Sequence, residues 1–195
     1  MDDMRDRLQR SLGELNTKVT TEWDATPAAV LMPLYQEDGD WKLLFTRRTE
    51  SVDVHAGQVS FPGGQIEVSD ETAVAAALRE AQEEIGLDPA DVELLGQLNP
   101  LFTVTQFLVT PVIGVIPWPY PLSSNPKEVA RTFGVPIKWL ADPNNREIRE
   151  RAPLIPGRNL KVYYFKKYEG ETIWGVTARI TVTFLQMLDA AGPPN

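Results

Sequence analysis

The chain has 195 residues, of which 43% are hydrophobic and 24% are charged, as in an ordinary soluble globular protein. Its formal net charge is −8 and it contains no basic block, which argues against nucleic acid or an anionic membrane as a general partner. Cysteine is absent, so disulfides, thiolate metal ligands and a cysteine nucleophile are excluded. The length is that of one domain, and we expect residues 1–195 to form a single unit.

The N-terminal segment is charged and has no apolar region of the kind found in signal peptides. The longest apolar stretch, residues 107–116, is too short to span a bilayer. We therefore expect a cytoplasmic protein with no membrane partner. Residues 1–20 are expected to form an N-terminal helical extension, with a short polar helix over residues 2–15.

The first part of the chain has the pattern of a β-hairpin. Residues 28–35 and 41–47 are predicted to be strands, and the sequence Glu-Asp-Gly-Asp at 37–40 is typical of the turn between them. A short extended piece over residues 58–61 then leads into a pair of glycines at 63–64.

A single amphipathic helix is predicted over residues 70–85. Ser69 or Asp70 can cap its start, Glu71 would lie in its first turn, and Gly86 can cap its end. The apolar residues that recur at helical spacing and form its buried side are Val74, Ala77, Leu78, Ala81 and Ile85.

The second half of the chain alternates between predicted strands and irregular segments. The apolar, β-branched run at residues 109–116 is typical of a buried strand, whereas four prolines within residues 117–126 indicate a stiff loop. An irregular segment is expected over residues 142–159. The remaining predicted strands cover residues 92–98, 128–135, 160–168 and 171–174, and the remaining helices cover residues 136–140 and 176–190. Strands interleaved with two substantial helices predict an α/β sandwich.

Three glutamates, Glu80, Glu83 and Glu84, lie three and four residues apart and therefore share one face of the predicted helix. Each like-charge pair costs about 0.2–0.5 kcal/mol, and the helix dipole disfavours each negative charge in the last turn by roughly 0.3–1 kcal/mol. The cluster is either a solvated acidic face or a site for a hard cation such as Mg²⁺ or Mn²⁺, which prefers oxygen ligands. The pair formed by Gly63 and Gly64 lets the backbone pass close to a bound ligand and favours a site.

Residues 79–87, with the sequence REAQEEIGL, resemble the second half of the Nudix box, whose general form is G-x5-E-x7-R-E-U-x-E-E-x-G-U. Glu71, eight residues before Arg79, falls on the isolated glutamate of that motif. Gln65 stands where the motif has its glycine, so the spacing from Gly64 to Glu71 is G-x6-E. This longer spacing is typical of the coenzyme A pyrophosphatase-like branch of the family.

A second signature of that branch resembles the segment before the helix. The matching residues are 43–49, LLFTRRT, and 55–64, HAGQVSFPGG. The branch commonly has an arginine four residues before its first glycine, where this chain has Asp53. The resemblance implies a Nudix-type α/β/α sandwich with a mixed β-sheet, and metal-dependent cleavage of a nucleoside diphosphate linked to another group.

The resemblance also assigns roles to the charged residues of the helix. It implies that Glu80 and Glu84 are the main ligands of Mg²⁺ or Mn²⁺ and that Glu83 supports a second ion. Arg79 would orient this cluster by pairing with Glu83 or with Glu71.

The residue that activates water is left open between two glutamates, Glu80 and Glu128. Glu128 lies in a loop-to-strand segment that resembles one with a characteristic acid in this branch. The alternative is an exposed loop carboxylate beside Lys127. The single histidine, His55, is expected to bond to the backbone or to touch the substrate rather than to act as an acid or base.

Other residues of the second signature are candidate substrate contacts. Arg47, Arg48 and Gln58 are placed to meet phosphates or the pantetheine arm of coenzyme A, although each could equally be a surface residue. Nearer the end of the chain, Trp174 either faces an adenine or packs in the core. Arg158 and Lys161 are cations that could contact the 3′-phosphate.

Three functions remain in competition. The leading hypothesis is a Mg²⁺- or Mn²⁺-dependent pyrophosphatase that cuts coenzyme A or acyl-coenzyme A into 3′,5′-ADP and (acyl-)4′-phosphopantetheine. The second keeps this chemistry on another small nucleotide substrate, such as ADP-ribose or NADH. The third is a binding module without turnover, which usually lacks some of the box carboxylates that this chain retains. The sequence leaves open whether the chain forms a homodimer.

Overall fold

The predicted hairpin lies at the centre of an eight-stranded sheet in the computed structural model, which describes residues 4–12, 25–50, 57–151 and 160–190. Strand β1 (Thr26–Glu37) pairs with β2 (Asp40–Arg48) in antiparallel register. The two residues between them, Asp38 and Gly39, have φ of +52° and +81°, the left-handed values that a tight hairpin turn needs. The hairpin prediction is confirmed.

The sheet is mixed because β1 pairs in parallel with β7 (Phe107–Val115), whereas the other pairs described in this sheet are antiparallel. The order along its main path is β3 (Val59–Ser60), β2, β1, β7 and β5 (Glu93–Gln97). The strands beside this path are β4 (Gly63–Gln65) on β1, β6 (Leu101–Phe102) on β7 and β8 (Val129–Pro136) on β2. The strands predicted over residues 92–98, 109–116 and 128–135 are confirmed.

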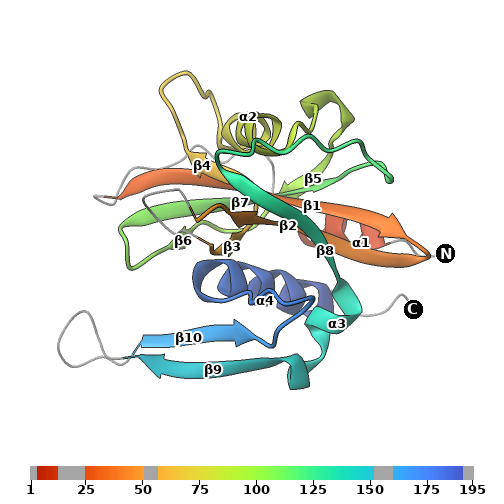
Figure 1. Cartoon of the computed structure of the whole chain (residues 1–195), viewed down its shortest axis with the longest axis vertical. Helices are drawn as coiled ribbons and strands as arrows, with labels where there is room; N and C mark the ends of the chain where they lie inside the picture. Colours follow the sequence, from red (N-terminus) through yellow and green to blue (C-terminus); the bar gives the residue numbers. More distant parts are fainter. Residues whose placement is uncertain (1–3, 13–24, 51–56, 152–159, 191–195) are drawn as a thin grey trace.

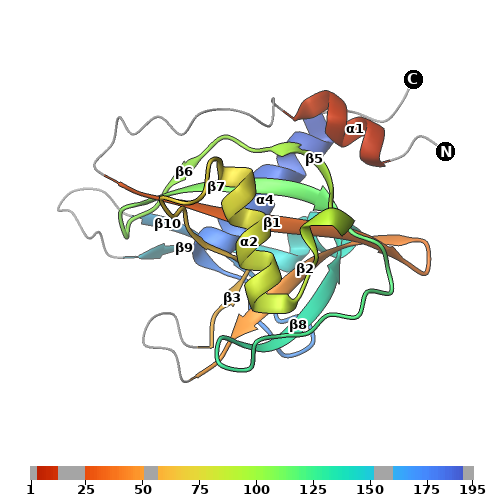
Figure 2. The same ribbon diagram turned by 90° about the horizontal axis from the view of Figure 1, so that it is seen from above.

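Helices cover both faces of the sheet. Figure 1 shows α2 (Ala73–Ile85) above it and α4 (Gly175–Ala190) below it, and Figure 2 shows α1 (Met4–Ser11), which packs against β5 and α4, at one end of the molecule. The short helices are η1 (Pro89–Asp91), α3 (Ile137–Ala141) and η2 (Pro143–Asn145). The predicted α/β sandwich with a mixed sheet is therefore confirmed. None of the helices in the described ranges is long and apolar enough to span a membrane.

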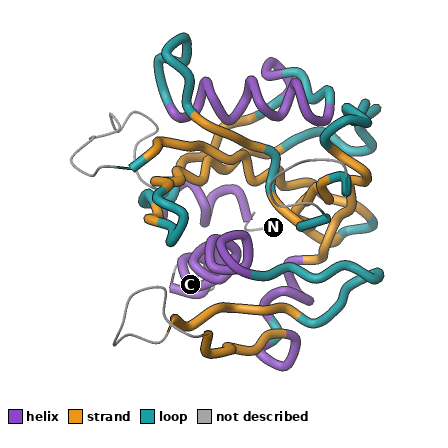
Figure 3. The backbone as a smooth tube through the Cα atoms, turned by 60° about the vertical axis from the view of Figure 1, so that its left-hand side comes forward, coloured by secondary structure: helices purple, strands orange, loops and turns teal. Residues whose placement is uncertain are grey.

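The sequence does not predict the two-stranded sheet that lies beyond α4 (Figure 1, Figure 3). Strand β9 (Arg146–Arg151) pairs there in antiparallel register with β10 (Leu160–Phe165). The prediction of an irregular segment over residues 142–159 is wrong for β9, because its sequence REIRER has one apolar residue and no strand pattern. The strand predicted over residues 171–174 is also wrong, since that segment makes only isolated bridges.

Helix α2 begins three residues later than the sequence predicts. Thr72 is its N-cap, with extended backbone at φ −144°, and its hydroxyl accepts a hydrogen bond of 3.1 Å from the N–H three residues on. The prediction that Ser69 or Asp70 caps the helix is wrong, and the carboxylate of Asp70 is instead held by Arg79. Gly86, with φ +67°, ends the helix as predicted.

An alanine-rich face brings α2 close to the sheet. Its buried apolar residues are Ala73, Ala76, Ala77, Ala81 and Ile85. They pack in one cluster with Leu31 of β1 and Leu44 of β2, whereas Val74 and Leu78, which the sequence predicts on this side, are only half-buried. Small side chains allow a close approach of helix and sheet. The carboxylates on the neighbouring face of α2 therefore reach the backbone of β4.

Candidate active site

The glycine pair begins strand β4 beneath α2, and neither glycine leaves room for a side chain. A Cβ atom at Gly63 would lie 2.6 Å from the Cα of Val30 in the paired strand β1. A Cβ atom at Gly64 would lie 2.6 Å from the carboxyl carbon of Glu80. The two glycines therefore let the carboxylate of Glu80 lie against the backbone at the edge of the sheet.

Glu84 is a buried carboxylate with an unsatisfied oxygen. Its exposed fraction is 3%, and its Oε2 atom has no hydrogen-bond partner among the described residues. Burial raises the pKa of Glu84 to about 8; Arg48, whose Nη1 is 3.7 Å from Oε1, opposes this rise, and the charges of Glu80 and Glu128 add to it. A charged oxygen buried without a partner is costly, so the side chain favours either a proton or a cation.

Glu80 shares this environment. Burial raises its pKa, Arg79 opposes the rise, and the negative charges of Glu83 and Glu128 reinforce it. Glu83 is the exposed member of the three, with 58% of its side chain accessible. The fold therefore gathers the negative charges of Glu80, Glu84 and Glu128 in one place, where they repel one another.

Arg79 is the clamp of the cluster, and its main partner is Asp70. Its Nη2 and Nε atoms donate to the two carboxylate oxygens of Asp70 at 2.9 and 3.1 Å, in the bidentate geometry of a strong charge-assisted pair. This hydrogen bonding lowers the pKa of Asp70. The same guanidinium donates to Glu80 at 3.0 Å and to Glu83 at 3.2 Å. The pairing with Glu83 is as predicted.

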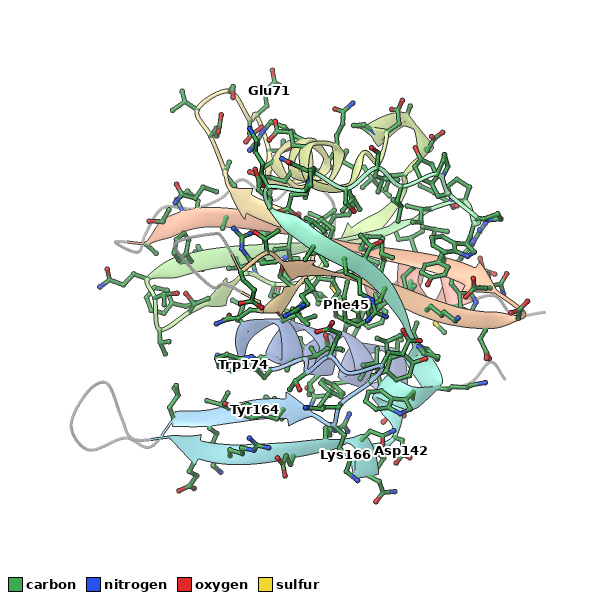
Figure 4. All side chains as sticks on the ribbon, viewed as in Figure 1. Phe45, Glu71, Asp142, Tyr164, Lys166 and Trp174 are labelled. Carbon is green, nitrogen blue, oxygen red and sulfur yellow. The ribbon has the colours of Figure 1, made fainter. Side chains whose placement is uncertain are left out.

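Glu71 lies apart from this clamp. The structure places it in the exposed segment before α2, so the expectation that it occupies the first turn is wrong (Figure 4). The described hydrogen bonds of Arg79 go to Asp70 and not to Glu71. The sequence predicts Asp70 only as a possible helix cap, although an acid one position before the motif glutamate is a signal for a partner of Arg79.

The loop before β8 carries Glu128 to the acidic cluster. The backbone N–H groups of Ser123 and Asn125 donate to the last carbonyl groups of α2, those of Ile85 and Glu84, at 2.9 and 2.8 Å. These bonds satisfy carbonyls that the helix end would leave free and fix the loop to the helix. Glu128 is half-buried, and Asn125 donates to its Oε1 at 3.3 Å.

The oxygen donors suit a hard divalent cation in kind, although they are not arranged around one. Among residues 4–12, 25–50, 57–151 and 160–190, no three carboxylate, imidazole or thiol side chains are positioned to hold a metal ion together. Arg79 explains this arrangement, because it holds Glu80 and Glu83 in ion pairs. A bound cation would compete with Arg79 for these carboxylates and would find the unsatisfied Oε2 of Glu84 beside them.

A cavity of about 710 Å³ borders the acidic cluster. The predicted substrate contacts that line it are Arg48, Gln58, Gly63 and Gly64. Lys161 and Trp174 line it as well, and the Trp174 ring stacks on Tyr164 with a centroid distance of 5.5 Å (Figure 4). Trp174 therefore packs against a neighbouring ring and forms part of the cavity wall at the same time.

One predicted substrate contact, Arg47, is not brought to this cavity. Arg47 is absent from its lining, and the guanidinium forms ion pairs with Glu50 at 2.6 Å and Glu171 at 3.5 Å. His55 lies outside the residues that the structure describes, as do Asp53 of the same signature and Arg158.

Helix α2 lies on one face of a mixed sheet and carries clustered glutamates together with an arginine that pairs with them. This is the arrangement expected of a Nudix enzyme. Residues 25–147 match the family described as NUDIX domain. The chain belongs to this family, and it is a Nudix hydrolase.

Relatives agree with this assignment. A protein of Photorhabdus laumondii named Uncharacterized Nudix hydrolase NudL is 40% identical over 78% of this chain and 80% of its own length, and the protein of the same name from Escherichia coli K12 is 36% identical over 92% and 90%. Among solved structures, the Nudix hydrolase RenU of M. smegmatis has a TM-score of 0.52 at 19% identity, covering 88% of this chain and 90% of its own. A MutT/nudix family protein from Enterococcus faecalis has a TM-score of 0.53 at 14% identity, covering 89% and 66%. These structures support the fold alone.

Proposed function

We propose that this Nudix hydrolase cleaves the pyrophosphate bond of coenzyme A or an acyl-coenzyme A, giving 3′,5′-ADP and (acyl-)4′-phosphopantetheine. The observation that carries the reaction is the buried carboxylate of Glu84, whose free Oε2 lies in the field of Glu80 and Glu128. The observation that carries the substrate is the second signature, since Arg48, Gln58 and the glycine pair line one cavity beside those carboxylates.

The proposal assigns the oxygens of Glu80 and Glu84, with support from Glu83, as ligands of Mg²⁺ or Mn²⁺. Such an ion would neutralise the charge of the diphosphate and make a water molecule a better nucleophile at neutral pH. Arg79, fixed by Asp70, keeps Glu80 and Glu83 at the site, so that the ligands are oriented before the substrate binds.

Arg48 is placed to hold a substrate phosphate. It lines the cavity, and its Nε atom is buried with no hydrogen-bond partner among the described residues. Its Nη1 is 3.7 Å from Glu84, too long for a strong pair. A phosphate oxygen between the cavity and the carboxylates would satisfy this guanidinium. The base that takes the proton from water is then Glu80 or Glu128, the two carboxylates whose charges act on Glu84.

A second candidate is the same cleavage on ADP-ribose or NADH. The observation that favours it is the position of Arg47, which belongs to the signature typical of coenzyme A pyrophosphatases. Arg47 pairs with Glu50 and Glu171 and does not line the cavity, so it does not act as the substrate contact that this signature implies. Both candidates are small nucleotide derivatives, and they share the metal site and the scissile pyrophosphate.

A product-resolved hydrolysis assay separates the candidates. Coenzyme A, acetyl-coenzyme A, ADP-ribose, NADH and a nucleoside triphosphate are each incubated with the enzyme and Mg²⁺ or Mn²⁺. We expect coenzyme A or its acetyl thioester to give the highest kcat/KM, with 3′,5′-ADP as a product. A higher kcat/KM for ADP-ribose or NADH would overturn the substrate and leave the cleavage chemistry intact.

A further inference from the structure

The cavity beside the acidic cluster extends between the lower layers of the fold. It is bounded by the sheet on one side and by α4 and β10 on the other, the layers that Figure 1 shows below the sheet. Its volume of about 710 Å³ falls within the range of roughly 300–1,000 Å³ usual for small-molecule sites. The apolar side chains that form these walls include Val30 and Val109 from the sheet, Val176 and Ile180 from α4, and Val162 from β10.

Three hydroxyl groups of the lining, those of Ser60, Thr177 and Thr103, are already engaged within the protein. Ser60 bonds to Thr46, Thr177 donates to the carbonyl of Val59, and Thr103 accepts from the N–H of Phe107. A purine ring in this part of the cavity would have to bury donor and acceptor atoms among such groups, whereas a hydrocarbon chain needs no hydrogen-bond partner. The walls therefore suit an aliphatic ligand better than a base.

Charge in the cavity is of one sign. Among the residues that the structure describes, its lining includes Arg48, Lys161 and Arg179 but no Asp or Glu, although the chain as a whole has a net charge of −8. Cationic side chains around apolar walls match a ligand that has anionic groups and a hydrocarbon part in the same molecule.

The rim of the cavity exposes apolar side chains to solvent. Phe102 is 47% exposed and Val104 is 52% exposed, and both belong to the cavity lining. The loop that carries them is ordered by Thr103, whose N–H and carbonyl bond to the Phe107 carbonyl and the Gln106 N–H at 2.8 and 3.1 Å. Exposed apolar side chains held in place at the entrance of a cavity mark a surface that an apolar ligand covers.

We propose that this cavity binds the acyl chain of an acyl-coenzyme A, and that the enzyme consequently prefers thioesters of medium-length aliphatic acids to free coenzyme A. The inference rests on the proposed function. The cavity is continuous with the proposed cleavage site, because Arg48, Gly63 and Gly64 line the cavity and also lie beside the carboxylates that would face the pyrophosphate. A substrate cut at the acidic cluster can extend its other end between β10 and α4.

The first test is a chain-length series on the wild-type enzyme, with coenzyme A and its acetyl, butanoyl, hexanoyl and octanoyl thioesters. Burial of one methylene improves binding by up to about fourfold. Because the cavity is partly open, we expect a smaller gain per carbon and a kcat/KM for octanoyl-coenzyme A at least about tenfold above that for the acetyl thioester. The release of 3′,5′-ADP reports each rate.

A matched pair of variants locates the chain in the cavity. Val104→Asp places a carboxylate at the apolar rim, where we expect the ratio of kcat/KM for octanoyl-coenzyme A to that for coenzyme A to fall at least about fivefold. Ile148→Asp is the control, because Ile148 is 54% exposed on β9 and outside the lining, and this change should leave the ratio as in the wild type. Thermal melting confirms that both variants fold.

The outcomes separate this inference from the proposed function. Cleavage of coenzyme A with a kcat/KM that does not change with chain length overturns the acyl cavity and leaves the proposed function standing. An equal fall in the ratio for both variants also overturns the cavity. Cleavage of ADP-ribose but of no coenzyme A thioester overturns the proposed function, and the inference with it.

Discussion

Two carboxylates near Arg79 show how position decides the chemistry of a side chain. The pKa of Asp70 is lowered because Arg79 binds both of its oxygens, whereas burial raises the pKa of Glu84 to about 8. Asp70 is thus a satisfied structural anion, whereas Glu84 has a buried Oε2 atom with no hydrogen-bond partner among the described residues. This contrast gives the two residues different expected roles, as a positioning residue and as a metal ligand.

Glu84→Gln tests the role of the unsatisfied carboxylate. The amide keeps the shape of the side chain but cannot become an anion that binds a metal ion, so we expect kcat to fall on the order of 10²–10³-fold while the melting temperature stays the same or rises. Steady-state kinetics and thermal melting measure both quantities. Full activity together with a strongly lowered melting temperature would show that Glu84 serves the fold and not the reaction.

Asp70→Asn tests which acid positions Arg79. Loss of the bidentate pair should free the guanidinium and weaken Mn²⁺ binding about 10–100-fold, the usual effect of removing a residue that orients metal ligands. Calorimetric titration with Mn²⁺ measures this, with Glu71→Gln as the comparison. We expect the smaller loss from Glu71→Gln, because Glu71 is exposed and precedes the helix. A larger loss from Glu71→Gln would contradict the clamp described here.

At the scale of elements, the site depends on how closely α2 lies on β4. The alanines on the buried face of α2 permit this close approach, and the two consecutive glycines of β4 leave room for it. The two glycines have different neighbours, since Gly63 faces the backbone of β1 and Gly64 faces the carboxylate of Glu80. Substitution of each should therefore produce a different defect.

Gly63→Ala and Gly64→Ala form a matched pair. The new methyl group at position 63 meets immobile backbone of Val30, so we expect a loss of about 1–3 kcal/mol in the free energy of unfolding. At position 64 it meets the flexible end of Glu80, which can rotate away, so stability should change less and kcat/KM should fall by up to about 100-fold. Denaturant unfolding and kinetics on both variants test this separation. The reverse pattern would contradict the placement of Glu80 on β4.

At the scale of the whole molecule, the sequence predicts what short-range patterns determine. The hairpin turn at Asp38 and Gly39, the alternating and apolar strands, and the end of α2 at Gly86 all follow from local chemistry. Strand β9 could not be predicted, because its charged sequence becomes a strand only through pairing with β10. Strand β4 could not be predicted either, since it has three residues and two of them are glycine.

The same limit applies to the site. The spacing of Glu80, Glu83 and Glu84 indicates a metal-binding face, but the burial of Glu84 depends on β4 and on the loop before β8. The cavity is built from segments that no short pattern connects, because its lining comes from the sheet, α4 and β10. The sequence therefore indicates the carboxylates of the proposed site more readily than the walls of the cavity.

Repulsion among the gathered carboxylates should also appear in the stability of the molecule. Burial and neighbouring negative charges make it costly for Glu80 and Glu84 to carry charge, and a cation held by these carboxylates would remove this cost in the folded state only. Binding to the folded state alone stabilises it by about 2.7 kcal/mol at a ligand concentration of 100 times Kd, which for a chain of this size is a rise of about 5–10 °C in melting temperature.

We therefore expect Mn²⁺ to raise the melting temperature relative to EDTA, and Glu84→Gln to lose most of that rise. Thermal melts of both proteins over a Mn²⁺ series measure it, and NaCl at equal ionic strength controls for screening of surface charge. An equal rise in the wild type and in Glu84→Gln would place the cation elsewhere on this acidic chain. No rise at millimolar Mn²⁺ would leave Arg79, and not a metal ion, as the partner of the cluster in the resting enzyme.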